Sequence, residues 1–121
     1  MRELNGNLVI VKSMDFAVRS VRLARYLRTD FHENDLARPV IRSGTSIGAN
    51  AREALRAQSR ADFHAKMSIS LREAEDTNYW LEFLFRTGYI SEKEYESMQT
   101  DCTELCKLLM CIVKATAKEK G

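Results

Sequence analysis

Apolar side chains recur along most of the chain at alternating spacings of three and four residues, the period of one face of an α-helix. The pattern is clearest in two segments of the second half, at about 60–87 and 92–117. The seam of the first segment consists of Met67, Leu71, Ala74, Asn78, Leu81 and Phe85. The seam of the second consists of Tyr95, Met98, Cys102, Leu105, Leu109, Ile112 and Thr116. Both segments are therefore predicted to be long helices.

Residues that cap helices mark the ends of these two segments. Ser59 stands before the earlier segment, and Gly88, a residue typical of helix C-termini, follows it. Ser91 and Glu94 have the spacing of a capping box at the start of the later segment. These signals predict that the connections between helices are short.

The first half of the chain is expected to hold two more helices, at about 13–29 and 35–56, after an extended N-terminal arm at 1–12. The expected inner seam of the earlier helix consists of Met14, Ala17, Val21 and Ala24. A second apolar face, separated from that seam by Ser20, consists of Phe16, Leu23 and Leu27. Four helices with short connections predict an all-α fold, a single antiparallel up-down four-helix bundle over residues 1–121.

The stretch "RSGTSIGAN" at 42–50 is unusually rich in small residues. A phosphate-binding loop would need a lysine directly after its last glycine and a strand before it, and neither is present. Gly44 and Gly48 are instead four residues apart, so in a helix they share one face and let a neighbouring backbone approach closely. We therefore predict a tightly packed helix here, with Pro39 in or near its first turn or marking a kink.

Polar residues beside that small face suggest a polar network between the second and third helices. Its expected members are Arg42, Ser46, Asn50 and Glu53 on one helix, and Glu73, Asp76 and Thr77 on the other. We expect Arg42 to meet a carboxylate such as Glu73 or Asp76, because such networks specify helix pairing and register. The alternative is a solvated polar face.

Composition and charge narrow the function. Hydrophobic residues make up 45% of the chain and charged residues 30%, which is ordinary for a globular protein. There is no signal-peptide-like or membrane-spanning segment, and the three cysteines form no disulfide framework, so a cytoplasmic protein is expected. Residues 1–60 carry a net charge of +5, with ten arginines, and residues 61–121 carry −3. That asymmetry suits either nucleic-acid contact or complementary halves within the fold or between subunits.

Candidate chemistry is weak. A di-iron site needs Glu-x-x-His motifs, and neither His32 nor His64 has a carboxylate three residues before it. Cys102 and Cys106 are one helical turn apart, but buried core thiols explain them better than half of a metal site does. We expect no catalytic residues, no metal and no cofactor, and hence no enzyme.

Three segments carry a resemblance to a known family: "RSGTSIGANAREA" at 42–54, "SRADFHAKMSISLREAEDTNYWLEFL" at 59–84 and "ELCKLLMCIVKATAK" at 104–118. They resemble the bacterial four-helix bundle proteins encoded in 23S rRNA intervening sequences, over the whole chain from Lys12 onward. Asp76 departs from the family, which more often shows Glu there, and so does Pro39, where a polar residue is common. The resemblance implies an up-down bundle that assembles as a homopentameric ring. It also implies kinship to the accessory variability determinant of diversity-generating retroelements.

A homo-oligomer is also expected from the surplus of apolar faces. The candidate interface residues are Phe16, Leu23, Leu27, Trp80 and Leu84. The candidate nucleic-acid contacts are Arg19, Arg22, Arg25, Arg52, Arg56 and Arg60. The leading hypothesis is a non-enzymatic ring that binds nucleic acid, RNA being favoured over DNA, with no membrane contact. The alternative is a scaffold that docks a partner enzyme such as a reverse transcriptase without touching nucleic acid.

Overall fold

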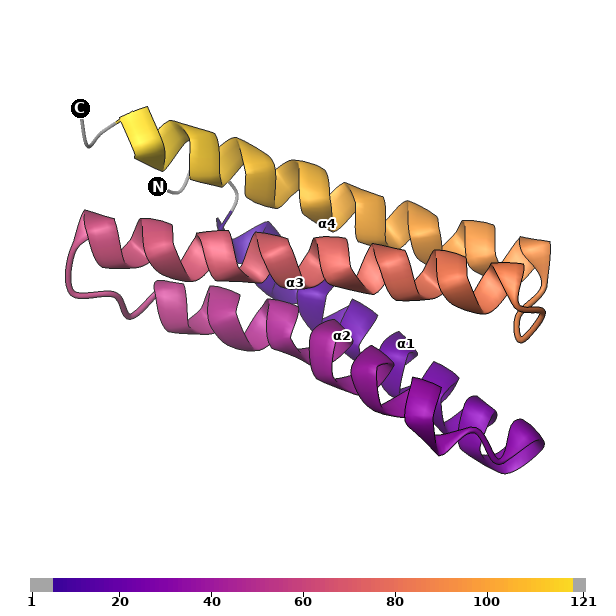
Figure 1. Ribbon diagram of the computed structural model, residues 1–121. Coiled ribbons are helices and arrows are strands. Elements are labelled where there is room, and N and C mark those ends of the chain that lie inside the picture. Colours follow the sequence, from indigo (N-terminus) through magenta and orange to yellow (C-terminus); the bar gives the residue numbers. More distant parts are fainter. Residues whose placement is uncertain (1–5, 119–121) are drawn as a thin grey trace.

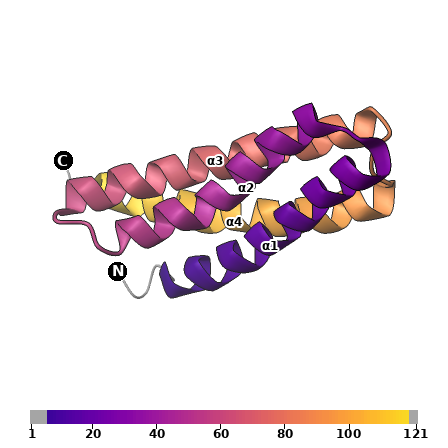
Figure 2. The same ribbon diagram turned by 90° about the horizontal axis from the view of Figure 1, so that it is seen from below.

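Four α-helices run up and down in succession, joined by short turns (Figure 1). The computed structural model describes residues 6–118, in which the helices are α1 (Gly6–Phe31), α2 (Asn34–Ala54), α3 (Arg60–Arg86) and α4 (Glu92–Lys118). No strand occurs within residues 6–118. The predicted all-α four-helix bundle is confirmed. Sequential helices pack as neighbours, so α2 lies between α1 and α3 (Figure 2).

The predicted caps are present at the ends of α3 and α4. Ser59 Oγ accepts a hydrogen bond of 3.1 Å from the backbone N–H of Asp62. Ser91 Oγ accepts one of 3.1 Å from the N–H of Glu94, whose carboxylate accepts one of 3.4 Å from the Ser91 N–H. Gly88 ends α3 with φ of +87°, a conformation that suits glycine because it has no side chain.

The small-residue stretch is helical, as predicted, and lies inside α2. Gly44 packs directly on Ser20 of α1, and Gly48 packs on Ser13. A Cβ atom added at Gly48 would lie 2.8 Å from Ser13 Oγ, and one at Gly44 would clash with both side-chain atoms of Ser20. The two glycines therefore let α1 and α2 approach more closely than larger residues would allow.

The buried face of α1 differs from the predicted one. Ser13 and Ser20 are fully buried, and Met14, expected on the inner seam, is 51% exposed. The serines are tolerated inside because each hydroxyl donates to a backbone carbonyl of the preceding turn, Ser20 to Phe16 at 3.0 Å and Ser13 to Ile10 at 3.2 Å. Their small size also makes room for the α2 glycines. The polar appearance of Ser20 in the sequence was therefore misleading.

The expected extended arm is also wrong where the structure describes it. Residues 6–12 form the first turns of α1, and the remainder of the predicted arm, 1–5, lies outside the described residues. Val9 explains the extension, because it is fully buried and lies one turn before Ser13 on the same face. Continuing the helix through residues 6–12 buries the Val9 side chain in the core.

Most of the proposed oligomer-interface residues belong to the core of the single chain. Phe16, Leu23, Leu27 and Leu84 are each no more than 8% exposed. They are covered by the other helices of the same bundle, so they are not available to another subunit, and this part of the prediction is wrong. Trp80 is half-buried at the edge of α3.

The polar contacts between α2 and α3 also differ from the predicted network. The side chains of Arg42, Glu73 and Asp76 have no ion pair within the described part of the chain, and Ser46 and Asn50 bond to carbonyls of their own helix. Short hydroxyl side chains make the contacts instead, because they fit between closely packed helices. Thr77 donates to Ser43 Oγ at 2.9 Å, and Ser70 donates to the carbonyl of Ile47 at 2.7 Å. Of the predicted members, Thr77 joins the two helices there, and Glu53 reaches α3 through Lys66 at 3.6 Å.

Ion pairs join the remaining pair of neighbours, α1 and α4. Arg19 lies 2.7 Å from Asp101 Oδ2 and also donates to Ser97 Oγ at 3.0 Å. Lys12 lies 3.2 Å from Glu104. None of the helices described in residues 6–118 combines the length and apolar character needed to cross a membrane.

Candidate nucleic-acid interface

The outer face of α2 carries a regular row of arginines with small residues at its centre. We call this row the arginine stripe; it consists of Arg38, Arg42, Thr45, Ala49, Arg52 and Arg56. Spacings of 4-3-4-3-4 place these residues on one side of the helix, opposite the buried residues Val40, Ile47 and Ala54. Arg56 lies in the turn directly after α2, where its N–H still bonds to the carbonyl of Glu53. At 1.5 Å per residue the stripe is about 27 Å long.

The stripe keeps most of its positive charge exposed to solvent. All four arginines are exposed, and Arg42, Arg52 and Arg56 have no carboxylate partner among the described residues. Arg38 lies 3.8 Å from Asp35, but both side chains are largely exposed, so this pair is weak. The nearby Glu53 is 3.6 Å from Lys66 on α3. Four guanidinium groups on one face can bind a row of anionic groups such as phosphates.

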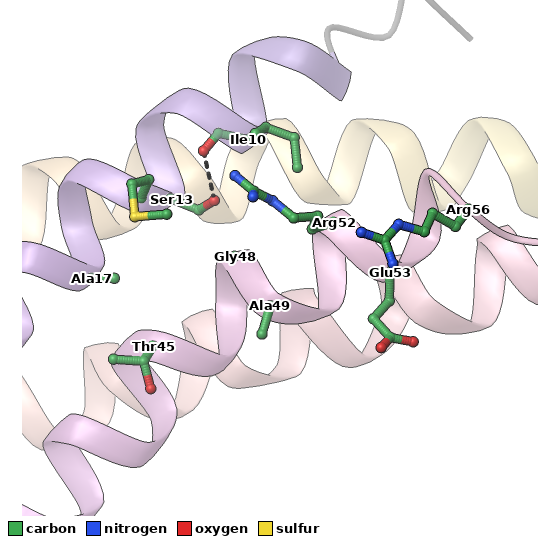
Figure 3. Close-up of a pocket in the computed structure, with 10 residues that line it drawn as sticks. Ile10, Ser13, Ala17, Thr45, Gly48, Ala49, Arg52, Glu53 and Arg56 are labelled. Carbon is green, nitrogen blue, oxygen red and sulfur yellow. Dashed lines mark hydrogen bonds between the residues drawn. The ribbon is translucent and has the colours of Figure 1, made fainter.

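A groove of about 510 Å³ runs beside the stripe, between α1 and α2 (Figure 3). It is lined by Ile10, Ser13, Met14, Ala17, Thr45, Gly48, Ala49, Arg52, Glu53 and Arg56. Small residues form the floor of the groove: Gly48 has no side chain, and Ala17 and Ala49 each carry one side-chain carbon. Arg52 extends from α2 toward Ile10 and Ser13 at one end of the groove. The small residues thus leave the surface of α2 open beside Arg52 and Arg56.

The arginines proposed from the sequence do not form one surface. Arg19 is tied to α4 through Asp101 and Ser97, which gives it a structural role. Arg22 and Arg25 are exposed on α1, and Arg60 is exposed at the first residue of α3. Of the six, Arg52 on α2 and Arg56 in the turn directly after it lie on the same side and line the same groove.

Sequence reasoning missed two members of that face. Arg38 was not considered, and Arg42 was assigned to an inward network although it is exposed. The signal that could have found both is the period, because Arg38 and Arg42 continue the spacing of Arg52 and Arg56 through the intervening residues.

The described residues hold no cluster suited to a metal ion. The most perturbed ionisable groups are Cys102 and Cys106 on α4. A hydrogen bond between their side chains, together with burial, raises the pKa of Cys102, while the same bond lowers the pKa of Cys106. Cys102 Sγ also lies 3.1 Å from the carbonyl oxygen of Ala74, a second acceptor within reach of its single S–H. His64 Nδ1 lies 2.7 Å from the buried Thr116 hydroxyl, at the other end of α3 from the aromatic residues Tyr79 and Phe83.

The fold and this surface define a class, a helical bundle with a basic outer face. Comparison with known proteins gives the family. The family model described as 23S rRNA-intervening sequence protein matches residues 6–111, so the chain belongs to that family. A crystal structure of a protein of unknown function from the S23 ribosomal protein family, from Bacteroides thetaiotaomicron, is 52% identical. The match covers 90% of this chain and 97% of that one, with a TM-score of 0.88. No curated protein is similar enough to count as a match. Neither of the two descriptions names an enzyme.

Proposed function

We propose that the protein is a non-enzymatic, oligomeric accessory protein that binds RNA through phosphate contacts along the arginine stripe. The observation that carries the proposal is the row of four exposed arginines along the outer side of α2 and the turn after it, three of them without a carboxylate partner in the described chain. Guanidinium groups suit phosphates because they are planar, always charged and donate in pairs. The family description, which refers to 23S rRNA, favours RNA over DNA as the nucleic acid.

The form of the surface supports backbone contact rather than base recognition. The stripe is straight and about 27 Å long, and its centre is formed by Thr45 and Ala49, which are too short to reach base edges. Phosphate contacts fix position and supply affinity that depends on salt but carry no sequence information. We therefore infer that the protein recognises RNA by its backbone. Repetition of the stripe in an oligomer, a pentameric ring being favoured, would multiply the contacts.

The experiment measures binding of a fluorescent RNA hairpin by anisotropy at salt concentrations from 50 to 200 mM, with a DNA hairpin of the same sequence alongside. If the four arginines of one copy each neutralise a phosphate of the duplex stem, affinity should fall roughly 150-fold over this range. The variant Arg42→Ala/Arg52→Ala should bind more weakly and have a shallower salt dependence, because two phosphate contacts are lost.

The matched control is Lys107→Ala/Lys114→Ala, which removes the same charge from exposed positions on α4. It should bind nearly as well as the wild type. Absence of binding at 50 mM salt would contradict the proposal, and so would an equal loss in both double variants. A ring that captures a partner protein equally well after the α2 substitutions, and binds no RNA, would instead favour a docking scaffold.

A further inference from the structure

The face of α1 that points away from the bundle is apolar. We call it the α1 seam; it consists of Val11, Met14, Val18 and Val21. Val11 is 58% exposed, Met14 51% and Val18 43%, while Val21 is half-buried. Spacings of 3-4-3 are those of a helix that packs along another helix, and a solvated helix would carry polar residues there. The seam therefore lacks a partner within its own chain.

The outer face of α3 has the same period. We call it the α3 ridge; it consists of Ile69, Arg72, Asp76, Tyr79 and Phe83. Tyr79 is 60% exposed and stacks on Phe83, with ring centroids 6.3 Å apart. Trp80 meets the Tyr79 ring edge-on at 5.1 Å. An aromatic cluster with one ring this exposed is typical of a protein contact surface.

The two faces lie at matching heights along the bundle. Ser13 of α1 packs on Gly48, and the adjacent Ile47 accepts the hydrogen bond of Ser70 on α3. Two turns further along α1 and α3, Ser20 packs on Gly44, and the adjacent Ser43 accepts the hydrogen bond of Thr77. In this up-down bundle α1 and α3 also run in the same direction. Residues equally far beyond these contacts therefore share a height.

At matching heights the charges of the two faces are opposite. Asp15, beside the α1 seam, lies at the height of Arg72. Asp15 is two residues beyond Ser13, and Arg72 is two residues beyond Ser70, which lies at the same height as Ser13. Arg22 lies at the height of Tyr79, and within one turn of Asp76. None of these four charged side chains has an ion pair within the described residues. An acid thus faces a base at one level, and a base faces an acid and an aromatic ring at the next.

From this correspondence we propose that the α1 seam of one copy packs in parallel on the α3 ridge of the next copy. The inference deepens the proposed oligomer and rests on it, because it names the two faces that form the contact. Val11 and Met14 would lie near Ile69, and Arg22 near Asp76 and Tyr79. The contact is heterologous, so each copy offers one α1 seam and one α3 ridge, and repetition of it can close into a ring.

Self-pairing of the α1 seam fits less well. An antiparallel pair centred between Met14 and Val18 would bring Arg22 of each copy opposite Ile10 of the other. Ile10 borders the groove that Arg52 also lines, so arginines of the two copies would approach one another. Like charges at a contact are unfavourable. Contact between α1 and α3 avoids this. It also leaves the arginine stripe outside the contact, on α2, which lies between α1 and α3 (Figure 2), with Met14 as the one residue shared by the α1 seam and the groove.

The test uses light scattering on the full chain, whose mass is 13.9 kDa. Val18→Glu in the α1 seam and Tyr79→Glu in the α3 ridge should each reduce the mass from that of an oligomer to that of one copy. Both positions are exposed, so the bundle should still fold, which circular dichroism checks. The control Thr100→Glu, at an exposed position of α4, should keep the wild-type mass.

Mixing the two monomeric variants distinguishes the two modes of assembly. Each retains one intact face, so a 1:1 mixture should form a complex of two copies, which neither variant forms alone. No complex in the mixture, or a wild-type mass for Tyr79→Glu, would overturn the proposal in favour of another interface. A charge exchange gives a second measure: Asp15→Arg or Arg72→Asp alone should weaken self-association roughly fivefold, and the double variant should restore it.

RNA binding by the same proteins separates this inference from the proposed function. If the wild-type protein binds RNA as an oligomer and neither glutamate substitution lowers the mass, the proposed interface alone is contradicted. Wild-type protein that is monomeric at high concentration contradicts the interface and the oligomer together. If the wild-type protein is an oligomer, both glutamate substitutions reduce its mass to that of one copy, and it binds no RNA, the interface is supported and the RNA proposal is contradicted.

Discussion

Gly44 of α2 packs so closely on Ser20 of α1 that no side-chain atom fits between them. The contact fixes the distance between α1 and α2 and determines which side of each helix faces away from the other. Because Ser20 points inward, Met14 and Val18 are left on the outside of α1. Because Gly44 points toward α1, Arg42 is left on the outside of α2. Both surfaces proposed as functional therefore depend on this pair.

Gly44→Ala should destabilise the protein although alanine is the better helix former. The added Cβ would clash with Ser20, and overpacking costs about 1–3 kcal/mol, against a gain of about 1 kcal/mol in helix propensity. We expect a net loss of up to about 2 kcal/mol in the free energy of unfolding, measured by urea denaturation. In a Ser20→Gly background the same substitution should be harmless. The control Gly6→Ala, with the nearest atom 3.7 Å from the added Cβ, should change stability little.

His32 is held in the left-handed region, with φ of 53°, in the turn between α1 and α2. A side chain there costs roughly 1 kcal/mol relative to glycine. His32→Gly should therefore raise the free energy of unfolding by about that amount. Gly88→Ala, at φ of +87°, should lower it by a similar amount. If His32→Gly were destabilising, the imidazole would have a favourable contact that outweighs the strain.

The Tyr89 hydroxyl donates a hydrogen bond of 2.9 Å to Glu33 Oε1, which joins the α3–α4 turn to the α1–α2 turn. This bond, with smaller effects of burial and of the Glu33 charge, raises the pKa of Tyr89 above 10.0. A raised pKa in the folded state means that the stabilisation is fully present below pH 10 and is lost as the pH rises through the higher value. The stability difference between wild type and Tyr89→Phe should therefore be constant up to about pH 9 and shrink above pH 10. A difference that stays the same up to pH 11 would show that the hydrogen bond does not couple to this titration.

Cys106 should be alkylated more readily than Cys102, because Cys102 is buried and its hydrogen bond lowers the pKa of Cys106. Cys102→Ala removes the donor, so the pKa of Cys106 should rise and its alkylation by iodoacetamide should slow at a fixed pH. Cys102→Ser keeps a hydroxyl donor and should slow it less. The rates are followed by mass spectrometry of the peptide that contains Cys106. Equal rates in the two variants would mean that the hydrogen bond has no influence on the thiolate.

The period of the apolar residues was enough to predict four helices, their order and most of their ends. It succeeded in α3 and α4, where residues of the predicted seams, such as Leu81 and Leu105, are buried in the core. Caps such as Ser59 and Ser91 act within a few residues, so their effect is visible in the sequence. The helical form of the glycine-rich stretch was predictable for the same reason.

The choice between two possible faces was decided by packing. Helix α1 has apolar residues on two sides, and local spacing cannot tell which side meets the bundle. The structure buries Phe16 together with Ser13 and Ser20, because small serines admit the glycines of α2, and it leaves Met14 outside. The arginine stripe has the same origin: its period is in the sequence, but its exposure depends on the opposite face of α2 being held by its neighbours. Local sequence determined where the helices form. The packing of their surfaces against one another determined which residues stay exposed and can contact a partner.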